Sequence, residues 1–299
     1  MAMKRAVQPS GEISGITLRA EPAHRPEAIP WHAWAAEFAG TFFMVAWGLS
    51  AVVFMMSASS PMQSLMPVYR VRLLLTGILF AAGGTLVVYS PLGERSGGHI
   101  NPAVSLTFWI LGKMGRRDMA LYSIAQFLGG LAGAVLVKFL WGGWATSVYA
   151  GVTMPAPWIS PAGAAGVEFL ITGSLLWVIL FFVSHPKWHR WTGFAAGVWI
   201  AFLVFAEAPV TGTSLNPARS LGPAVVTDTY RDLWVYFLGP LGGATAVALL
   251  WKPTVAAGVR SVFCAKLFHT DRYRCHLADC HFAERHPSAY GVSQKEDLP

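Results

Sequence analysis

The chain contains six long stretches of apolar residues separated by shorter polar connections. They cover residues 31–56, 73–93, 119–141, 164–184, 191–206 and 233–251, and each carries at most one charged side chain. A helix that crosses a bilayer needs about 20 predominantly apolar residues at a rise of 1.5 Å per residue. The pattern therefore predicts an all-α membrane protein with six transmembrane helices.

The composition supports this interpretation and excludes other classes. Of the 299 residues, 54% are hydrophobic and only 12% are Asp, Glu, Lys or Arg, whereas soluble proteins average about 25% charged residues. So little charge cannot cover a water-exposed surface, and so much hydrophobicity is not typical of disorder. The chain also lacks a recognisable catalytic motif or a phosphate-binding loop. We therefore expect neither an enzyme nor a cofactor.

The cationic residues indicate how the chain is oriented. Most of the 22 Lys and Arg residues lie in residues 1–31, in the second-to-third and fourth-to-fifth connections, and after the sixth stretch. The positive-inside rule then places both termini in the cytoplasm, in a protein of the plasma membrane. We expect cytoplasmic tails at 1–31 and 253–299 around a membrane domain at 32–252. The net charge of +7 reflects this topology rather than a nucleic-acid partner.

The membrane domain contains an internal repeat. Glu37-Phe38-Ala39-Gly40-Thr41 opens the first stretch, and the similar Glu168-Phe169-Leu170-Ile171-Thr172 opens the fourth. An Asn-Pro-Ala triplet occurs once in each half, at 101–103 and at 216–218. The halves, about 32–142 and 164–252, are separated by three spans and are therefore inverted in the membrane. Inverted repeats with short interrupted segments are typical of transport sites near the bilayer midplane.

Each triplet predicts a re-entrant half-helix. The apolar stretch after each one is only about ten residues long, which is too short to cross a bilayer. Asn is a favoured N-cap and Pro is suited to the first helical position. Asn101 and Asn216 are the only asparagines in the chain. If each side-chain oxygen caps its own helix, we expect the amide hydrogens to point into a lumen.

These motifs resemble those of the aquaporin, or major intrinsic protein, family. The resemblance covers about residues 32–252 and rests on the segments 96–104 and 213–220 around the triplets. It implies six transmembrane helices and two re-entrant half-helices in an inverted repeat, with one pore per subunit and four subunits per assembly. The pore motifs would be formed by six residues: Asn101, Pro102, Ala103, Asn216, Pro217 and Ala218.

The resemblance also implies a selectivity filter beyond the midplane. Arg219 follows Asn216 by three residues and belongs on the same helix face; a membrane arginine should face water. Thr213 matches a second filter position directly. Phe80 matches the aromatic position if one residue is inserted before Gly97, whereas an ungapped count gives Ala81. The fourth position is Val204, where strict water channels usually have His and glycerol channels usually have Gly.

Other positions favour the water-channel branch of the family. Glycerol-type members follow the filter arginine with Asp, whereas this chain has Ser220, and it has Ala224 where they often have Lys. Tyr236 is aromatic, as in water-type members. The sequence thus suggests a water channel that also leaks small neutral solutes. Its alternatives are a glycerol or small-solute facilitator with water as a minor permeant and, more remotely, a proton-coupled transporter.

Buried polar residues have two interpretations each. As family positions, Glu37 and Glu168 hold the re-entrant loops by accepting backbone N–H bonds, whereas in a coupled transporter they would carry protons. His99 lines the inner vestibule through its backbone or ring, or is a loop histidine without a role. Glu207 is either a solvated charge in the vestibule or a cation site, and we expect the solvated charge.

The C-terminal tail contains a group of potential metal ligands outside the family core. The Cys275-His276 and Cys280-His281 pairs repeat at a five-residue step, with Cys264, His269 and His286 nearby. Thiolates and imidazoles bind zinc and copper. However, the spacing is not that of a zinc finger or ribbon, and the simpler expectation is a disordered basic tail with reduced thiols and no metal.

Overall fold

The structure is a computed structural model and describes residues 30–185, 187–256, 262, 264–270, 272–273, 275–277 and 280. All secondary structure in these residues is helical. The long helices are α1 (Trp31–Met56), α3 (Tyr69–Tyr89), α6 (Arg116–Trp141), α8 (Pro161–Val183), α9 (Thr192–Thr211) and α11 (Val235–Ala256). The short ones are α2 (Met62–Leu65), α4 (Pro91–Ser96), α5 (Pro102–Ile110), α7 (Gly143–Ser147) and α10 (Pro217–Thr227), with 3₁₀ turns η1 (Tyr149–Gly151) and η2 (His189–Trp191).

The prediction of six spanning helices is confirmed. Six helices in the described part of the chain are long and apolar enough to cross a membrane. Large apolar side chains also point outward from them, among them Phe139, Leu170 and Leu250, which are 83%, 69% and 67% exposed. A contiguous apolar exterior of this kind suits contact with lipid rather than with water.

The end of the second span differs from the prediction. The apolar pattern extended this span to Gly93, but α3 ends at Tyr89 and the separate helix α4 begins at Pro91. The Ser90 hydroxyl accepts the Leu92 N–H at 3.2 Å and caps α4, with Pro91 at its first position. Ser-Pro is a helix-start signal. The prediction followed the hydrophobic pattern alone and so missed this signal.

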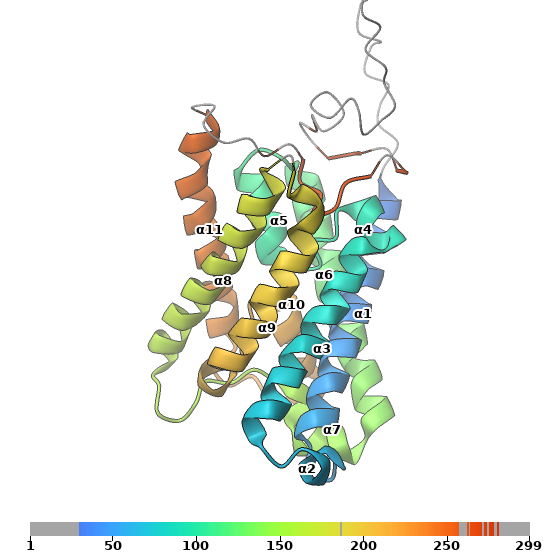
Figure 1. The fold of residues 1–299 in the computed structure, drawn as a ribbon, viewed down its shortest axis with the longest axis vertical. Coiled ribbons are helices and arrows are strands. Elements are labelled where there is room, and N and C mark those ends of the chain that lie inside the picture. The colour runs from blue at the N-terminus through green and yellow to red at the C-terminus, as the bar shows by residue number, and fades with distance from the viewer. Residues whose placement is uncertain are drawn as a thin grey trace, which may run out of the picture. The chain divides into compact units, whose positions relative to one another are not determined.

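The two halves of the chain pack in matching pairs. Helix α1 packs on α6, and α8 packs on α11 (Figure 1). Both pairs approach closely at glycines: a Cβ on Gly129 would lie 2.4 Å from the Phe38 carbonyl oxygen, and one on Gly243 would lie 2.3 Å from that of Phe169. Small residues allow such close helix approach in membranes.

Each half-helix packs against a long helix of the other half of the chain. Helix α10 packs on α6 of the first half, and α5 packs on α11 of the second half. As a result both short helices lie among the long ones in Figure 1. This packing brings the two Asn-Pro-Ala triplets together.

A buried lumen between two half-helices

Each triplet begins its half-helix as the sequence analysis expected of an N-cap. The Asn101 side-chain oxygen accepts the Ala103 N–H at 2.9 Å, and that of Asn216 accepts the Ala218 N–H at 3.0 Å. Pro102 and Pro217 occupy the first helical positions. The two helix N-termini, which carry positive partial charge, therefore lie at the same place inside the bundle.

The two asparagines also tie the halves to each other. The Asn101 amide donates to the Leu215 carbonyl at 2.8 Å, and the Asn216 amide donates to the Ile100 carbonyl at 2.8 Å. An amide group has two hydrogens, so each asparagine uses one of them to hold the opposite loop. The expectation that both hydrogens face the lumen is therefore wrong, because one is engaged in the backbone of the other half.

Glu37 holds the loop that precedes α5. Its two carboxylate oxygens accept the N–H groups of His99 and Ile100 at 3.0 and 2.6 Å, and the Gln126 amide donates to it at 2.7 Å. Ile100 has a φ of 45°, a left-handed conformation that a branched residue rarely adopts. The buried carboxylate compensates for this strain by satisfying the backbone of the loop.

Glu168 holds the loop that precedes α10 in the same way. It accepts the N–H groups of Ser214 and Leu215 at 2.8 and 3.0 Å, and the Thr211 hydroxyl at 2.7 Å. Leu215 has a φ of 59° and so repeats the left-handed conformation of Ile100. The two carboxylates are both completely buried and make equivalent contacts in the two halves.

A cavity of about 750 Å³ runs past both triplets. Gln63, Tyr69 and Arg72 line one end of it, which we call the Arg72 end, and His99 and Leu267 line the other, which we call the His99 end. Asn101, Asn216 and Arg219 line it between these ends. The described residues thus enclose a lumen along the bundle that is lined mostly by apolar residues, with polar side chains among them.

All four residues expected in the filter line this lumen: Phe80, Val204, Thr213 and Arg219. The Arg219 guanidinium lies over the Phe80 ring at 5.3 Å and donates to the Gly151 carbonyl at 2.8 Å. Val204 lines the same cavity. Glycines make this arrangement possible, because a Cβ on Gly48 would lie 2.5 Å from the Phe80 ring. Ala81 also lines the cavity, but it is Phe80 that stacks on Arg219.

Glu207 is arranged differently from the expectation. Glu207 is 8% exposed and accepts the hydroxyl groups of Thr211 and Thr213, each at 2.6 Å. The expectation of a solvated vestibule charge at Glu207 is therefore wrong. It is a buried acceptor of the Thr213 hydroxyl, and the Thr211 hydroxyl lies within hydrogen-bond distance of both Glu207 and Glu168. Sequence spacing did not predict that Thr211 contacts both Glu168 and Glu207.

His99 lies at the end of the lumen, and its ring is fully engaged. Nδ1 is 3.0 Å from the Ser105 hydroxyl, Nε2 is 2.7 Å from the Ala265 carbonyl oxygen, and the ring stacks on Phe108. The Ala265 contact comes from the C-terminal segment. The sequence could not reveal this partner, because it lies 166 residues further along the chain.

The described part of the C-terminal tail is folded rather than unstructured. Cys264, Ala265, Lys266 and Leu267 are all buried, which corrects the expectation of a disordered tail for these residues. Of the suggested ligands, His276 lies with Nε2 3.0 Å from the Tyr122 hydroxyl instead of beside the cysteines. His281 and His286 lie outside the described residues, as do residues 1–29.

Fold and lumen together define a helical membrane channel with two half-helices that meet at the centre. The family model described as "Major intrinsic protein" matches residues 25–251. The protein called "Aquaporin NIP1-4" of Oryza sativa subsp. japonica is 34% identical over 233 residues, which is 76% of this chain and 78% of that protein. "Aquaporin Z" of Brucella melitensis biotype 1 is 31% identical over 229 residues, 73% of this chain and 95% of that protein.

A solved structure has the same fold. The X-ray structure of the aquaglyceroporin from Plasmodium falciparum superposes with a TM-score of 0.65 at 24% identity, over 77% of this chain and 99% of that one. The chain belongs to the major intrinsic protein family. It is a multi-pass integral membrane protein and, like other members of this family, a channel for water, small solutes or both rather than an enzyme.

Proposed function

We propose that water is the main permeant of this channel and that small neutral solutes also pass. The observation that carries this proposal is the charge of the lumen. Among the described residues, the lining contains the two arginines Arg72 and Arg219 and no carboxylate. Together with the positive ends of α5 and α10, these arginines oppose cations and protons, an arrangement that is typical of aquaporin-type selectivity.

The pore motifs supply a small number of polar contacts for water. We propose that the triplets Asn101-Pro102-Ala103 and Asn216-Pro217-Ala218 form the central station, each asparagine keeping one amide hydrogen beyond its cross-bond. Arg219 would form the second station, since a guanidinium has five donors and one is used on Gly151. Separated donors in an otherwise apolar lumen bind water weakly enough for it to leave.

Leakage of small neutral solutes is proposed from the apolar residues of the filter. Phe80 and Val204 present apolar surface there, whereas a histidine at position 204 would add a polar group and narrow the passage. The same residues support the second candidate, a glycerol or small-solute facilitator, because apolar surface beside hydrogen-bond donors suits a carbon chain with hydroxyls. Ser220, Ala224 and Tyr236 favour water.

The remote alternative is a proton-coupled transporter, and Glu37 and Glu168 do not meet its main requirement. A coupling carboxylate must exchange protons with the transport pathway. Glu37 and Glu168 are absent from the lining among the described residues, and both oxygens of each accept hydrogen bonds from the re-entrant loops. We therefore assign them a structural role.

A substitution at Val204 tests the permeant assignment. In reconstituted vesicles, Val204→His should lower glycerol permeability more than water permeability, because the larger polar side chain excludes the larger solute first. Val198→His is a suitable control, since Val198 lies on the same helix with its side chain 54% exposed. An unchanged ratio of glycerol to water permeability in Val204→His would contradict a filter role for this residue.

We further propose that the channel domain spans residues 32–252 and assembles as a homotetramer in the plasma membrane. Both termini would lie in the cytoplasm, as the distribution of Lys and Arg favours. This orientation puts the His99 end of the lumen inside the cell and the Arg72 end outside. Labelling of single cysteines by a membrane-impermeant thiol reagent in intact cells would test it.

A further inference from the structure

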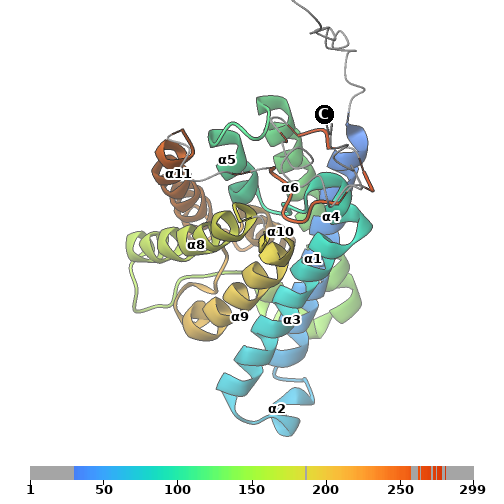
Figure 2. The same cartoon turned by 45° about the horizontal axis from the view of Figure 1, so that its top comes forward.

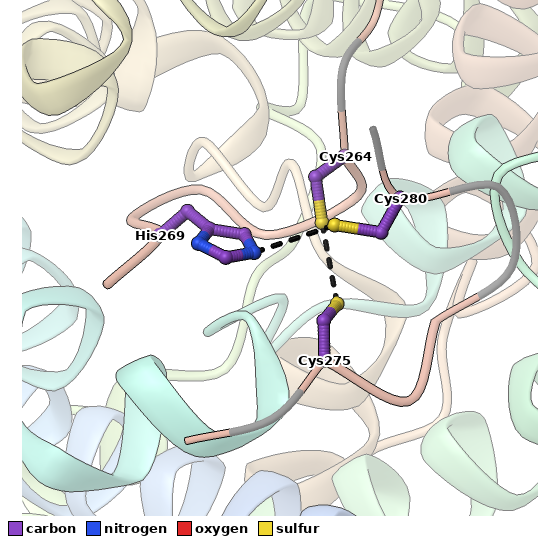
Figure 3. Close-up of side chains that lie close together, drawn as sticks. All are labelled: Cys264, His269, Cys275 and Cys280. Carbon is purple, nitrogen blue, oxygen red and sulfur yellow. Dashed lines mark hydrogen bonds between the residues drawn. The ribbon is translucent and has the colours of Figure 1, made fainter. Parts of the chain in front are cut away.

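Four side chains of the C-terminal segment converge on one point. Cys264, His269, Cys275 and Cys280 each offer one ligand atom, and these atoms all lie within 4.8 Å of one another. The sulfurs of Cys264 and Cys275 are 3.4 Å apart, and the Cys280 sulfur is 3.3 Å from His269 Nε2. Figure 3 shows the four groups pointing toward one another from separate stretches of the segment.

These distances fit a tetrahedral metal site. Zinc binds sulfur at about 2.3 Å and histidine nitrogen at about 2.0–2.1 Å, so neighbouring ligand atoms lie about 3.4–3.8 Å apart around it. A disulfide would need a separation of about 2.05 Å, and all three cysteines are free. Three cysteines and one histidine are a common ligand set of closed, structural zinc sites.

We propose that Cys264, His269, Cys275 and Cys280 bind a structural zinc ion that holds the C-terminal segment against the His99 end of the lumen. The ligand set leaves no position for a substrate, which favours a structural ion. We expect the held segment to restrict flow through the lumen. This effect on flow rests on the channel function argued above, whereas the binding of zinc does not.

The position of the ligands explains why the ion would matter to the lumen. Cys264 and His269 bracket residues 265–268, which contact the loop before α5. The Ala265 carbonyl lies 2.7 Å from His99 Nε2, and the Leu267 N–H donates to the Gly97 carbonyl at 3.0 Å. Leu267 itself lines the cavity. A metal bound on both sides of this short stretch fixes the side chain that borders the lumen.

The rest of the segment is anchored to α4 and α6. Lys266 is 1% exposed and donates to the Glu94 carbonyl at 2.6 Å, and Arg272 pairs with the Glu94 carboxylate at 3.4 Å. His276 lies against Tyr122 of α6. Figure 2 shows the segment beside α4. With zinc bound, we expect the C-terminal segment to stay in contact with the end of the lumen and to restrict water flow. Without zinc, the segment loses the cross-link between its ligands, and we expect it to move away and water permeability to rise.

The binding of zinc is tested on the full chain carrying an affinity tag without histidines. After purification without added metal, elemental analysis should find about one zinc per subunit, as a closed structural site retains its ion. Cys275→Ser and His269→Ala should lose it. His276→Gln is the matched control. His276 follows the ligand Cys275 in the chain but does not belong to the cluster, so this variant should keep its zinc.

Two further measurements use the wild type and therefore test the zinc site even if a variant misfolds. Wild type stripped of zinc should rebind it stoichiometrically, and cobalt in its place should give the charge-transfer absorption of thiolate ligands. Failure of the stripped wild type to bind either metal would overturn the site. If the wild type as first purified, before any stripping, contains no zinc and has a Cys264–Cys275 disulfide, this result would overturn the site as well.

Control of the lumen is tested separately by osmotic swelling of proteoliposomes. A membrane-permeant zinc chelator should raise water permeability severalfold in wild type, and Cys275→Ser should match chelated wild type with or without chelator. If zinc binds but the chelator changes nothing, control of the lumen is refuted while the site stands. If no condition gives water flux while zinc still binds, it is the proposed permeant that fails.

Discussion

At the scale of single residues, polar side chains inside the bundle satisfy the backbone of the re-entrant loops, and the two asparagines also line the lumen. Asn216 caps α10 with its oxygen and holds the Ile100 carbonyl with its nitrogen. Glu37 and Glu168 satisfy the loops that carry left-handed residues. A buried polar group left without a partner is costly, so these residues fix the geometry on which selection depends.

Removal of Glu168 should therefore destabilise the second re-entrant loop. Glu168→Ala leaves the N–H groups of Ser214 and Leu215 without their acceptor, at a cost of about 1–3 kcal/mol for each unsatisfied group. We expect a lower melting temperature in detergent and a loss of water flux. Glu168→Gln keeps one acceptor oxygen and should lie between wild type and Glu168→Ala; equal melting of Glu168→Ala and wild type would refute the role.

At the scale of helices, the close contacts between long helices depend on glycine. In the pairs α1–α6 and α8–α11 the backbone of one helix touches a glycine of the other. Hydrophobic length predicted the six spans, and the Asn-Pro signal predicted the start of both half-helices. These features are local and can be read from short windows. The separate helix α4 was missed because its Ser-Pro start lies at the end of an apolar run.

Gly243→Ala should separate α8 from α11. The new Cβ would lie 2.3 Å from the Phe169 carbonyl oxygen, and overpacking of this kind typically costs about 1–3 kcal/mol. Gly166→Ala is the matched control, because nothing lies within 4 Å of its Cβ position and alanine favours a helix. We expect thermal unfolding in detergent to show destabilisation of Gly243→Ala only, and similar melting of both variants would contradict the close approach.

At the scale of the whole molecule, the features that could not be predicted connect distant parts of the chain. The Glu207 contacts depend on the turn between α9 and α10, and the tail contacts join Ala265 to His99 and Lys266 to Glu94. The sequence indicated metal-binding residue types in the tail, but the repeated pairs favoured His276 and His281 beside Cys275 and Cys280, with Cys264 and His269 named only as nearby residues. Only the folded arrangement brings the three cysteines and one histidine together.

The central claim is that this chain is a passive channel whose main permeant is water. Its most direct test is the osmotic water permeability of proteoliposomes in stopped flow, with the zinc chelator present so that the C-terminal segment is released. We predict water flux well above that of empty liposomes, greater than glycerol flux and unchanged when a proton gradient is collapsed. Water flux equal to that of empty liposomes, or flux that requires the proton gradient, would contradict the claim.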